Sequence, residues 1–354
     1  MQQIIQGIEH LPEAIKQLHC HHFMLVCDAY YPFLAIKEQI EALVTPTTSF
    51  SDFTPNPLQG QVDQGTKLFL SKSCDAILAV GGGSAIDVAK CIKLACIDKV
   101  KKIPFIAIPT TAGTGSESTH NAVVYLNGIK QTVTDDRILP DYALLESSVL
   151  ETLPIYQKKC TMMDALCQGI ESWWSVNSTE ESKSYSQKAV DLIITHWKQY
   201  IIENDKAAAR EIMLAANFSG KAINIAQTTA AHAMSYKITS LYGLSHGHAV
   251  AICLPEIWLF MMKHMELCID MRGEEYLTNI FQQIAKTLGF SNILQACEFL
   301  HSLLATLDLR YPTSNNRDKE LEILTHSINP VRLKNNPIHI AEDVAYRLYS
   351  KIIK

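Results

Sequence analysis

The chain has 354 residues, of which 47% are hydrophobic and 19% charged, so it can build packed cores and is not a disordered or low-complexity chain. The 31 Lys and Arg against 36 Asp and Glu give a net charge of −5, which leaves no basic surplus for nucleic acid or a membrane surface. At roughly 100–200 residues per domain, this length favours two domains.

Cysteine usage and the apolar segments indicate the compartment. The 10 cysteines are scattered and form no C-x-x-C pair, as expected in a reducing environment. The N-terminal residues lack the basic and apolar regions of a secretion signal. The most apolar later stretch, residues 251–262, contains Pro255 and Glu256 and is too short to span a bilayer. These features predict a soluble cytoplasmic protein.

Short apolar runs alternate with helical patterns over the first ~150 residues. Runs that are apolar on both faces suit strands of a parallel sheet covered by helices, so a βαβ arrangement is expected. The predicted strands are residues 23–27, 76–80 and 105–108, and the predicted helices are residues 57–70 and 84–96.

The pattern becomes helical after Pro154, with almost no strand signal. The candidate helices are residues 164–175, 180–200, 207–223, 228–238 and 280–288. The sequence therefore predicts an α/β domain over residues 1–155 and an all-α domain over residues 156–354.

Two loops follow predicted strands and suit an anionic ligand. Gly81-Gly82-Gly83-Ser84 runs from a strand into a helix, where free N–H groups and the helix dipole favour a pyrophosphate. The alternative is a tight turn with Ser84 as the helix N-cap. The second loop, residues 108–117, carries four hydroxyl side chains and two glycines, which suit phosphate and ribose or, alternatively, helix capping.

One Asp and two His form a plausible metal-ligand set in the helical half. Asp164 and Gln168 share one helix face, as do His232 and Tyr236 on a later helix. A Gly-containing turn then brings His246 and His248. Such groups suit Zn(II) or Fe(II), although a helical His is more often a core or surface residue.

The loops and the His/Asp set together resemble the iron-containing alcohol dehydrogenase family. The matching segments are residues 81–90, 108–117, 164–171 and 232–255, in the family's order. The resemblance implies an N-terminal nucleotide-binding domain, a C-terminal helical domain and an NAD(P)-dependent oxidoreductase that acts on alcohols or aldehydes. It also implies a homodimer or a larger homo-oligomer.

The resemblance assigns the metal site. Asp164, His232 and His246 match three of the family's usual four ligands to Fe(II) or Zn(II), and Gln168 stands where the fourth is commonly His. Tyr236 replaces a second helix histidine that often serves the proton path. Tyr236, His248 and a metal-bound water therefore remain open as proton donors.

The resemblance also assigns the cofactor contacts. Asp28 ends the first predicted strand, where its charge would accept from ribose hydroxyls and favour NAD(H) over NADP(H), although an ordinary turn residue is the alternative. The expected cofactor-binding residues are Asp28, Asn56, Gly82, Gly83, Ser84, Asp87, Thr110, Thr111 and Lys130.

The sequence around 164–178 and 228–243 resembles one branch of the family, the phosphonoacetaldehyde reductases. That branch implies reduction of phosphonoacetaldehyde to 2-hydroxyethylphosphonate. Lys237, Thr239 and His120 are then candidates for holding the phosphonate, and Lys237 is a candidate catalytic residue. A solvated Lys237 on the opposite helix face is the alternative.

Three other functions stay open. The chain could be a dehydrogenase for another small aldehyde or alcohol. Sugar-phosphate cyclases such as dehydroquinate synthase share the two-domain architecture, NAD and a metal, but act as lyases. A non-catalytic dinucleotide-binding protein would explain Gln168 and Tyr236 in place of histidines.

Overall fold

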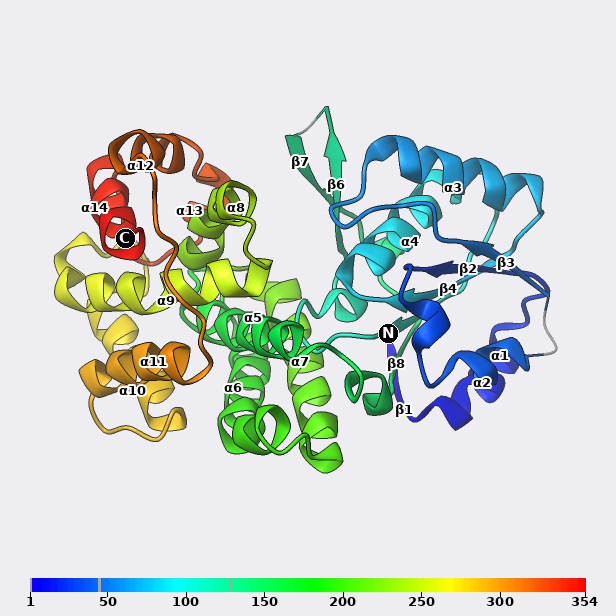
Figure 1. Cartoon of the computed structure of the whole chain (residues 1–354), viewed down its shortest axis with the longest axis horizontal. Coiled ribbons are helices and arrows are strands. Elements are labelled where there is room, and N and C mark those ends of the chain that lie inside the picture. Colours follow the sequence, from blue (N-terminus) through cyan, green and yellow to red (C-terminus); the bar gives the residue numbers. More distant parts are fainter. Residues whose placement is uncertain (1, 44–45, 128) are drawn as a thin grey trace. The chain divides into compact units, whose positions relative to one another are not determined.

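The computed structural model describes residues 2–43, 46–127 and 129–354, and the chain divides into two compact units (Figure 1). The first unit contains the residues up to Pro154 together with Ile202–Gly220. The second contains Ile155–Ile201 and Lys221–Lys354. The sequence division near residue 155 placed residues 202–220 with the helical part, whereas their contacts place them in the first unit.

The first unit is built on a six-stranded parallel sheet in the order β1-β8-β5-β4-β2-β3. The strands are β1 (Gln3–Gln6), β2 (Phe23–Cys27), β3 (Thr47–Phe50), β4 (Ala76–Gly81), β5 (Phe105–Pro109) and β8 (Tyr142–Leu145). The helices are α1 (Leu11–Leu18), α2 (Lys37–Glu41), α3 (Gln59–Ser71) and α4 (Gly83–Cys96). An antiparallel hairpin joins β6 (Asn121–Leu126) and β7 (Ile129–Thr134).

The strand order reverses between β2 and β4. The chain passes from β2 outward to β3 and then returns to β4 on the other side of β2. Cys27 pairs with Val80 and Gly81 pairs with Pro109, so β2, β4 and β5 end at one edge. Ligands of open parallel sheets bind outside the carboxyl ends of strands at such a reversal.

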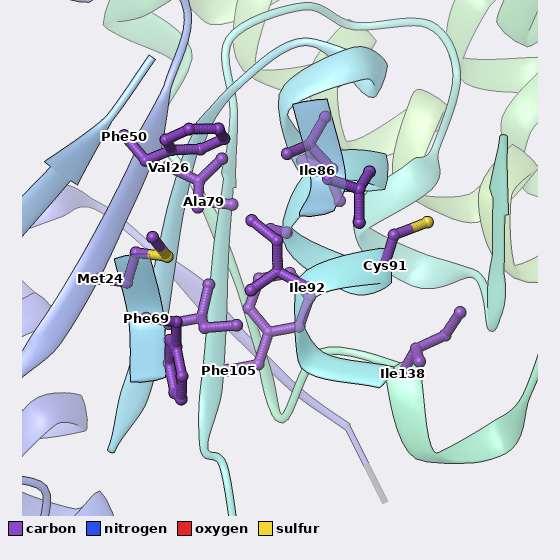
Figure 2. Packing of buried hydrophobic residues seen from close by; sticks show 14 of the residues in the cluster. Met24, Val26, Phe50, Phe69, Ala79, Ile86, Cys91, Ile92, Phe105 and Ile138 are labelled. Atoms are coloured by element: carbon purple, nitrogen blue, oxygen red, sulfur yellow. The ribbon is translucent and has the colours of Figure 1, made fainter. Parts of the chain in front are cut away.

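The core of the first unit lies between the sheet and the helices α3 and α4 (Figure 2). Phe105 of β5 and Ile86 and Ile92 of α4 are fully buried in it, together with Phe69 of α3. Fully burying each such side chain contributes roughly 1.5–3 kcal/mol. This packing fixes the start of α4 against the carboxyl edge of the sheet.

Residues 206–220 of helix α7 (Lys206–Ala226) are part of the first unit. The backbone of α7 at Gly220 packs directly against the loop backbone at Gly115. A Cβ atom on Gly220 would lie 2.5 Å from the carbonyl oxygen of Gly115. Asn217 donates to Glu117 Oε1 at 3.0 Å and to Ser118 Oγ at 2.6 Å. The hydroxyl-rich loop after β5 is thereby attached to α7.

The second unit is helical. Its helices are α5 (Ile155–Trp174), α6 (Glu180–Ile201), α8 (Ala230–Tyr242), α9 (His246–Lys263), α10 (Glu274–Thr287), α11 (Ile293–Thr306), α12 (Arg317–His326), α13 (Pro330–Leu333) and α14 (Glu342–Ile352). Buried Trp173, Trp174 and Trp258 occupy its interior. α9 continues through Pro255, and the sequence analysis predicted no helix at these residues. The tertiary packing around this buried helix offsets the missing N–H group.

The predicted fold class is confirmed: a parallel α/β domain is followed by a helical one. Within residues 2–43, 46–127 and 129–354, no helix is long and apolar enough to cross a membrane.

Candidate functional site

Three side chains of the second unit converge as a candidate metal site. Asp164 comes from α5, His232 from α8, and His246 is the first residue of α9. Their potential ligand atoms all lie within 4.8 Å of one another. Asp164 Oδ1 lies 3.3 Å from His232 Nε2 and 4.0 Å from His246 Nε2. The structure thus brings together three of the four predicted ligands around one point.

Glu171 orients His232 and was missed as a site residue. It follows Asp164 by about two turns on the same face of α5. One carboxylate oxygen accepts from His232 Nδ1. The other accepts from Thr229 Oγ1 at 2.8 Å and from Ala231 N at 2.9 Å, and so satisfies the start of α8. In the neutral ring that metal binding requires, Nδ1 keeps its proton and the lone pair of Nε2 is available beside Asp164 and His246.

The donor atoms fit a divalent metal. Asp164 Oδ1 and His232 Nε2 are buried, and neither has a hydrogen-bond partner among the described residues. Such orphaned groups are costly unless a ligand satisfies them. Burial lowers the pKa of His232, but the negative charges of Glu171 and Asp164 outweigh it and raise the pKa to about 9. Burial raises the pKa of Asp164, yet the neighbouring histidines bring it below its usual value.

Gln168, the fourth predicted ligand, is buried one turn after Asp164. Its side chain helps to lower the pKa of the Asp164 carboxyl group. Coordination of a metal by Gln168 remains a prediction.

Gly247 allows α9 to start directly against α5. A Cβ atom at this position would lie 2.0 Å from the carbonyl oxygen of Cys160 and 2.9 Å from Asp164 Cβ. Since the neighbouring atoms include α5 backbone, they cannot move aside cheaply. The glycine in the matched His246-Gly247 segment carried this signal, but the sequence analysis gave it no role.

Tyr236 lies beside the candidate metal site. Its ring stacks on the His246 ring, with centroids 5.8 Å apart and an interplanar angle of 11°. The positive charge of Arg332 on α13, a residue that the sequence analysis did not identify, acts on the Tyr236 hydroxyl. Burial raises the pKa of Tyr236, and the positive charge of Arg332 opposes that rise.

The structure does not support His248 as a proton donor. Its Nε2 donates to the Arg310 carbonyl at 2.9 Å, and its Nδ1 accepts from the Tyr156 hydroxyl at 3.0 Å. Tyr156 also accepts from Ser245 N at 3.3 Å. Burial lowers the pKa of His248 and favours the neutral ring. This histidine anchors the start of α9 instead.

The three candidate phosphonate contacts do not all come from the same element. Lys237 follows Tyr236 on α8 and is turned about 100° away from it around the helix axis. The Thr239 hydroxyl donates to the Ser235 carbonyl at 3.2 Å. His120 belongs to the first unit and is ion-paired with Asp136 at 2.7 Å. Only Thr239 shares a helix face with His232.

The glycine loop stands at the reversal in strand order. Gly82 is the N-cap of α4 and Gly83 its first residue, so Ser84 lies inside the helix and is not the cap. A Cβ atom on Gly81 would lie 2.9 Å from Asp28 Oδ2. The Asp28 carboxylate and the free N–H groups of α4 therefore border the same small space.

The other predicted cofactor residues of the first unit differ in their burial and in their contacts. Thr110 is buried and its N–H donates to the Gly81 carbonyl at 3.1 Å. Thr111 Oγ1 would lie 3.5 Å from a Cβ atom on Gly82. Asn56 is exposed and left-handed at φ 60°, in a turn. The positive charge of Lys130 on β7 opposes the rise that burial causes in the pKa of Asp87.

Asp87 has a structural role that differs from its predicted one. Its oxygens accept from Ser116 Oγ at 2.6 Å and from Val123 N at 2.9 Å. Fully buried Lys90 donates to the Ser116 carbonyl at 2.6 Å and to the Asn121 carbonyl at 2.7 Å. These two side chains therefore attach α4 to the hydroxyl-rich loop and to β6. Contact between Asp87 and a cofactor remains a prediction.

The fold and the site define a protein with a dinucleotide-type sheet in one unit and an Asp–His–His cluster in the other. The family model for iron-containing alcohol dehydrogenases matches residues 2–147. The model for the C-terminal part of the Fe-containing alcohol dehydrogenase family matches residues 159–353. The chain therefore belongs to the iron-containing alcohol dehydrogenase family and is an oxidoreductase that acts on CH–OH groups.

Individual relatives agree with this assignment. The chain is 28% identical over 274 residues to an NAD-dependent methanol dehydrogenase of Bacillus methanolicus, with 72% of each chain covered. It is 34% identical over 241 residues to a phosphonoacetaldehyde reductase of Streptomyces viridochromogenes, covering 61% of this chain and 60% of that relative. The solved NAD+ complex of a sulfoacetaldehyde reductase from Bifidobacterium kashiwanohense superposes with a TM-score of 0.87 at 25% identity, covering 99% and 96% of the two chains.

Proposed function

We propose that this chain is a metal-dependent, NAD(H)-linked reductase of small aldehydes, with phosphonoacetaldehyde as its substrate. The observation that carries the proposal is the buried, unsatisfied pair formed by Asp164 Oδ1 and His232 Nε2 beside His246. A dinucleotide-binding protein without catalysis would have no use for such a pair. The family assignment favours a dehydrogenase over the cyclase alternative.

Asp164, His232 and His246 would hold the divalent metal. One carboxylate and two imidazoles suit Fe(II), and Zn(II) also accepts this set. Glu171 keeps the His232 ring in the tautomer that binding needs. A bound metal would supply Lewis-acid polarisation of the aldehyde carbonyl, and the reduced nicotinamide would supply the hydride.

In the first unit, the N–H groups at Gly82, Gly83 and Ser84 would bind the pyrophosphate at the start of α4. Asp28 would accept from the ribose hydroxyls and repel a 2′-phosphate, so NAD(H) is favoured over NADP(H). Thr110, Thr111, Asn56 and Lys130 would complete the cofactor contacts.

In the second unit, Tyr236 remains the candidate to deliver a proton to the product oxygen, since its ring stacks on His246. The phosphonate part of the proposal rests on the Streptomyces relative and on the sulfonated substrate named for the Bifidobacterium structure. Both named substrates are aldehydes that carry an anionic phosphonate or sulfonate group.

The direct test is NADH oxidation, followed by absorbance, with phosphonoacetaldehyde, lactaldehyde and butyraldehyde in the presence of Fe(II) or Zn(II). A strong preference for phosphonoacetaldehyde supports the full proposal. Turnover of the neutral aldehydes alone rejects the phosphonate and keeps the reductase. Bound NADH without turnover of any aldehyde rejects the reductase and favours a non-catalytic protein.

Asp164→Asn tests the role of the metal. Chelation should abolish the activity of the wild type, and added metal should restore it. The Asp164→Asn variant should stay inactive after metal is added, because the substitution removes the charge of the ligand while conserving its shape. Full recovery of activity on adding metal would contradict the assigned role of Asp164.

A further inference from the structure

We infer that Arg332 is the specificity-determining residue of this site and binds an oxyanionic group on the aldehyde substrate. The inference rests on the proposed aldehyde reductase function and adds the residue that selects the substrate's charge. Arg332 lies on α13, in the same unit as the Asp–His–His cluster.

Arg332 is connected to the candidate metal site through Tyr236. The Tyr236 ring stacks on His246. α13, which carries Arg332, packs against α8, and the positive charge of Arg332 acts on the Tyr236 hydroxyl. A planar guanidinium carries five N–H donors in a fork that matches phosphonate or sulfonate oxygens, and its hydrogen bond to the Gln227 amide uses one of them.

The side chain of Arg332 is positioned by neutral groups. Its Nη1 donates to Gln227 Oε1 at 3.3 Å, and Asn335 Nδ2 donates to the same oxygen at 3.2 Å. Asn335 is buried and also donates to the Thr228 carbonyl at 3.0 Å, just before α8. Gln227 directly follows α7 and is left-handed at φ 61°, as residues that end a helix commonly are.

The charges around this site favour an anion. Arg332 is half-buried, and in the part of the chain that the structure describes it forms no ion pair with a carboxylate. The Asp164 and Glu171 charges would be balanced by a divalent metal. Arg332 is then the uncompensated positive charge, and an anionic substrate group would balance it.

Arg332 replaces Lys237 as the main candidate for this contact. Lys237 points about 100° around α8 from Tyr236, whereas the charge of Arg332 acts on the Tyr236 hydroxyl. The guanidinium also gives the two-point geometry that an ammonium lacks.

The test compares Arg332→Gln and Arg332→Lys with the wild-type metal-loaded enzyme on phosphonoacetaldehyde, sulfoacetaldehyde and butyraldehyde. The ratio of kcat/KM for each anionic aldehyde to that for butyraldehyde should fall about 10- to 100-fold in Arg332→Gln. Arg332→Lys should lose less. Lys334→Gln, an exposed cation on the same segment, is the matched control and should keep the ratio within about twofold.

A binding measurement separates this inference from the proposed function. Calorimetry with 2-hydroxyethylphosphonate should give weaker binding to Arg332→Gln than to Lys334→Gln, with the fold of each variant checked by circular dichroism. An unchanged ratio and unchanged binding would overturn the role of Arg332. If the wild type reduces only butyraldehyde and does not bind the phosphonate, the inference fails and the reductase stands. If it reduces no aldehyde, the proposed function fails, and the binding result alone decides for or against Arg332.

Discussion

The carboxylate of Glu171 binds both a candidate metal ligand and the start of α8. One oxygen accepts from His232 Nδ1, while the other satisfies the first N–H groups of α8. Partners of this kind fix the tautomer and the direction of a metal-binding ring. The position of a single carboxylate therefore couples the start of a helix to the geometry of its ligand.

Glu171→Gln should lower metal affinity about 10- to 100-fold, because the amide still accepts at the start of α8 but no longer supports the charge of the ligand ring. Competition with a fluorescent chelator measures the effect. Glu180→Gln, whose side chain is 93% exposed on α6, is the control and should bind metal like the wild type. Equal affinity of Glu171→Gln and the wild type would show that His232 is oriented by packing alone.

Residue types that carry chemistry were recognisable in the sequence, but their partners were not. Asp164, His232 and His246 stand in matched segments, and the structure brings them together. Arg332 lies outside the four motif segments that carried the family resemblance, so nothing in its neighbourhood along the chain predicted that its charge would act on Tyr236. Such contacts depend on which helices pack together.

Close helix packing sets the position of His246. α9 begins against α5 because Gly247 has no side chain to meet the Cys160 carbonyl. α4 is fixed in the same way by specific contacts, in this case the buried pair of Asp87 and Lys90. In both units, the start of one helix is held by groups on a neighbouring element.

Gly247→Ala should destabilise the protein by about 1–3 kcal/mol or more and weaken metal binding, since α9 must shift away from Asp164. Urea unfolding and metal titration measure the two effects. Gly60→Ala is the matched control, because a Cβ atom there meets nothing within 4 Å, and its stability should change by less than about 1 kcal/mol. Normal metal binding by Gly247→Ala would contradict this account of the site.

Lys90→Met should cost about 2–6 kcal/mol in the free energy of unfolding, because it leaves the buried carbonyl oxygens of Ser116 and Asn121 without their donor. Lys67→Met, at an exposed position of α3, controls for the loss of a lysine. Thermal unfolding provides the comparison. A similar midpoint for both variants would mean that water replaces the ammonium at no cost.

At the scale of the whole molecule, the two groups of candidate residues lie in different units. The glycine loop and Asp28 belong to the first unit, and the Asp–His–His cluster belongs to the second. A ligand that binds the native state stabilises the segment that holds it. Metal and cofactor should therefore each slow amide hydrogen exchange in a different unit.

Adding Fe(II) or Zn(II) to the chelated protein should slow amide hydrogen exchange in α5 and at the starts of α8 and α9. Adding NADH should slow exchange at residues 81–84 and 110–111. Mass spectrometry of the exchanged peptides measures both, with Mg²⁺ as the control ion. Metal protection confined to the first unit would refute the assigned metal site.

Periodicity and turn chemistry in the sequence determined the fold class, the three central strands, and the two loops at their carboxyl ends. Those features depend on neighbours along the chain, which is why local patterns reveal them. The edge strands β1 and β3 and the inner strand β8 are short, so local patterns missed them. The β6–β7 hairpin was also missed, although Asn127-Gly128 is a strong hairpin-turn signal in the sequence. α9 was also missed, and it continues through Pro255 because tertiary packing outweighs a lost N–H group.

The sequence by itself also supplied the ligand types, through Asp164, His232 and His246 in their matched segments. Only the tertiary structure decided their supporting groups: Glu171 on His232, Arg332 on Tyr236, and the partners that occupy His248. It also assigned residues 202–220 to the first unit. The physical reason is that orientation, burial and charge compensation depend on side chains distant in sequence, whose contacts exist only after the helices have packed.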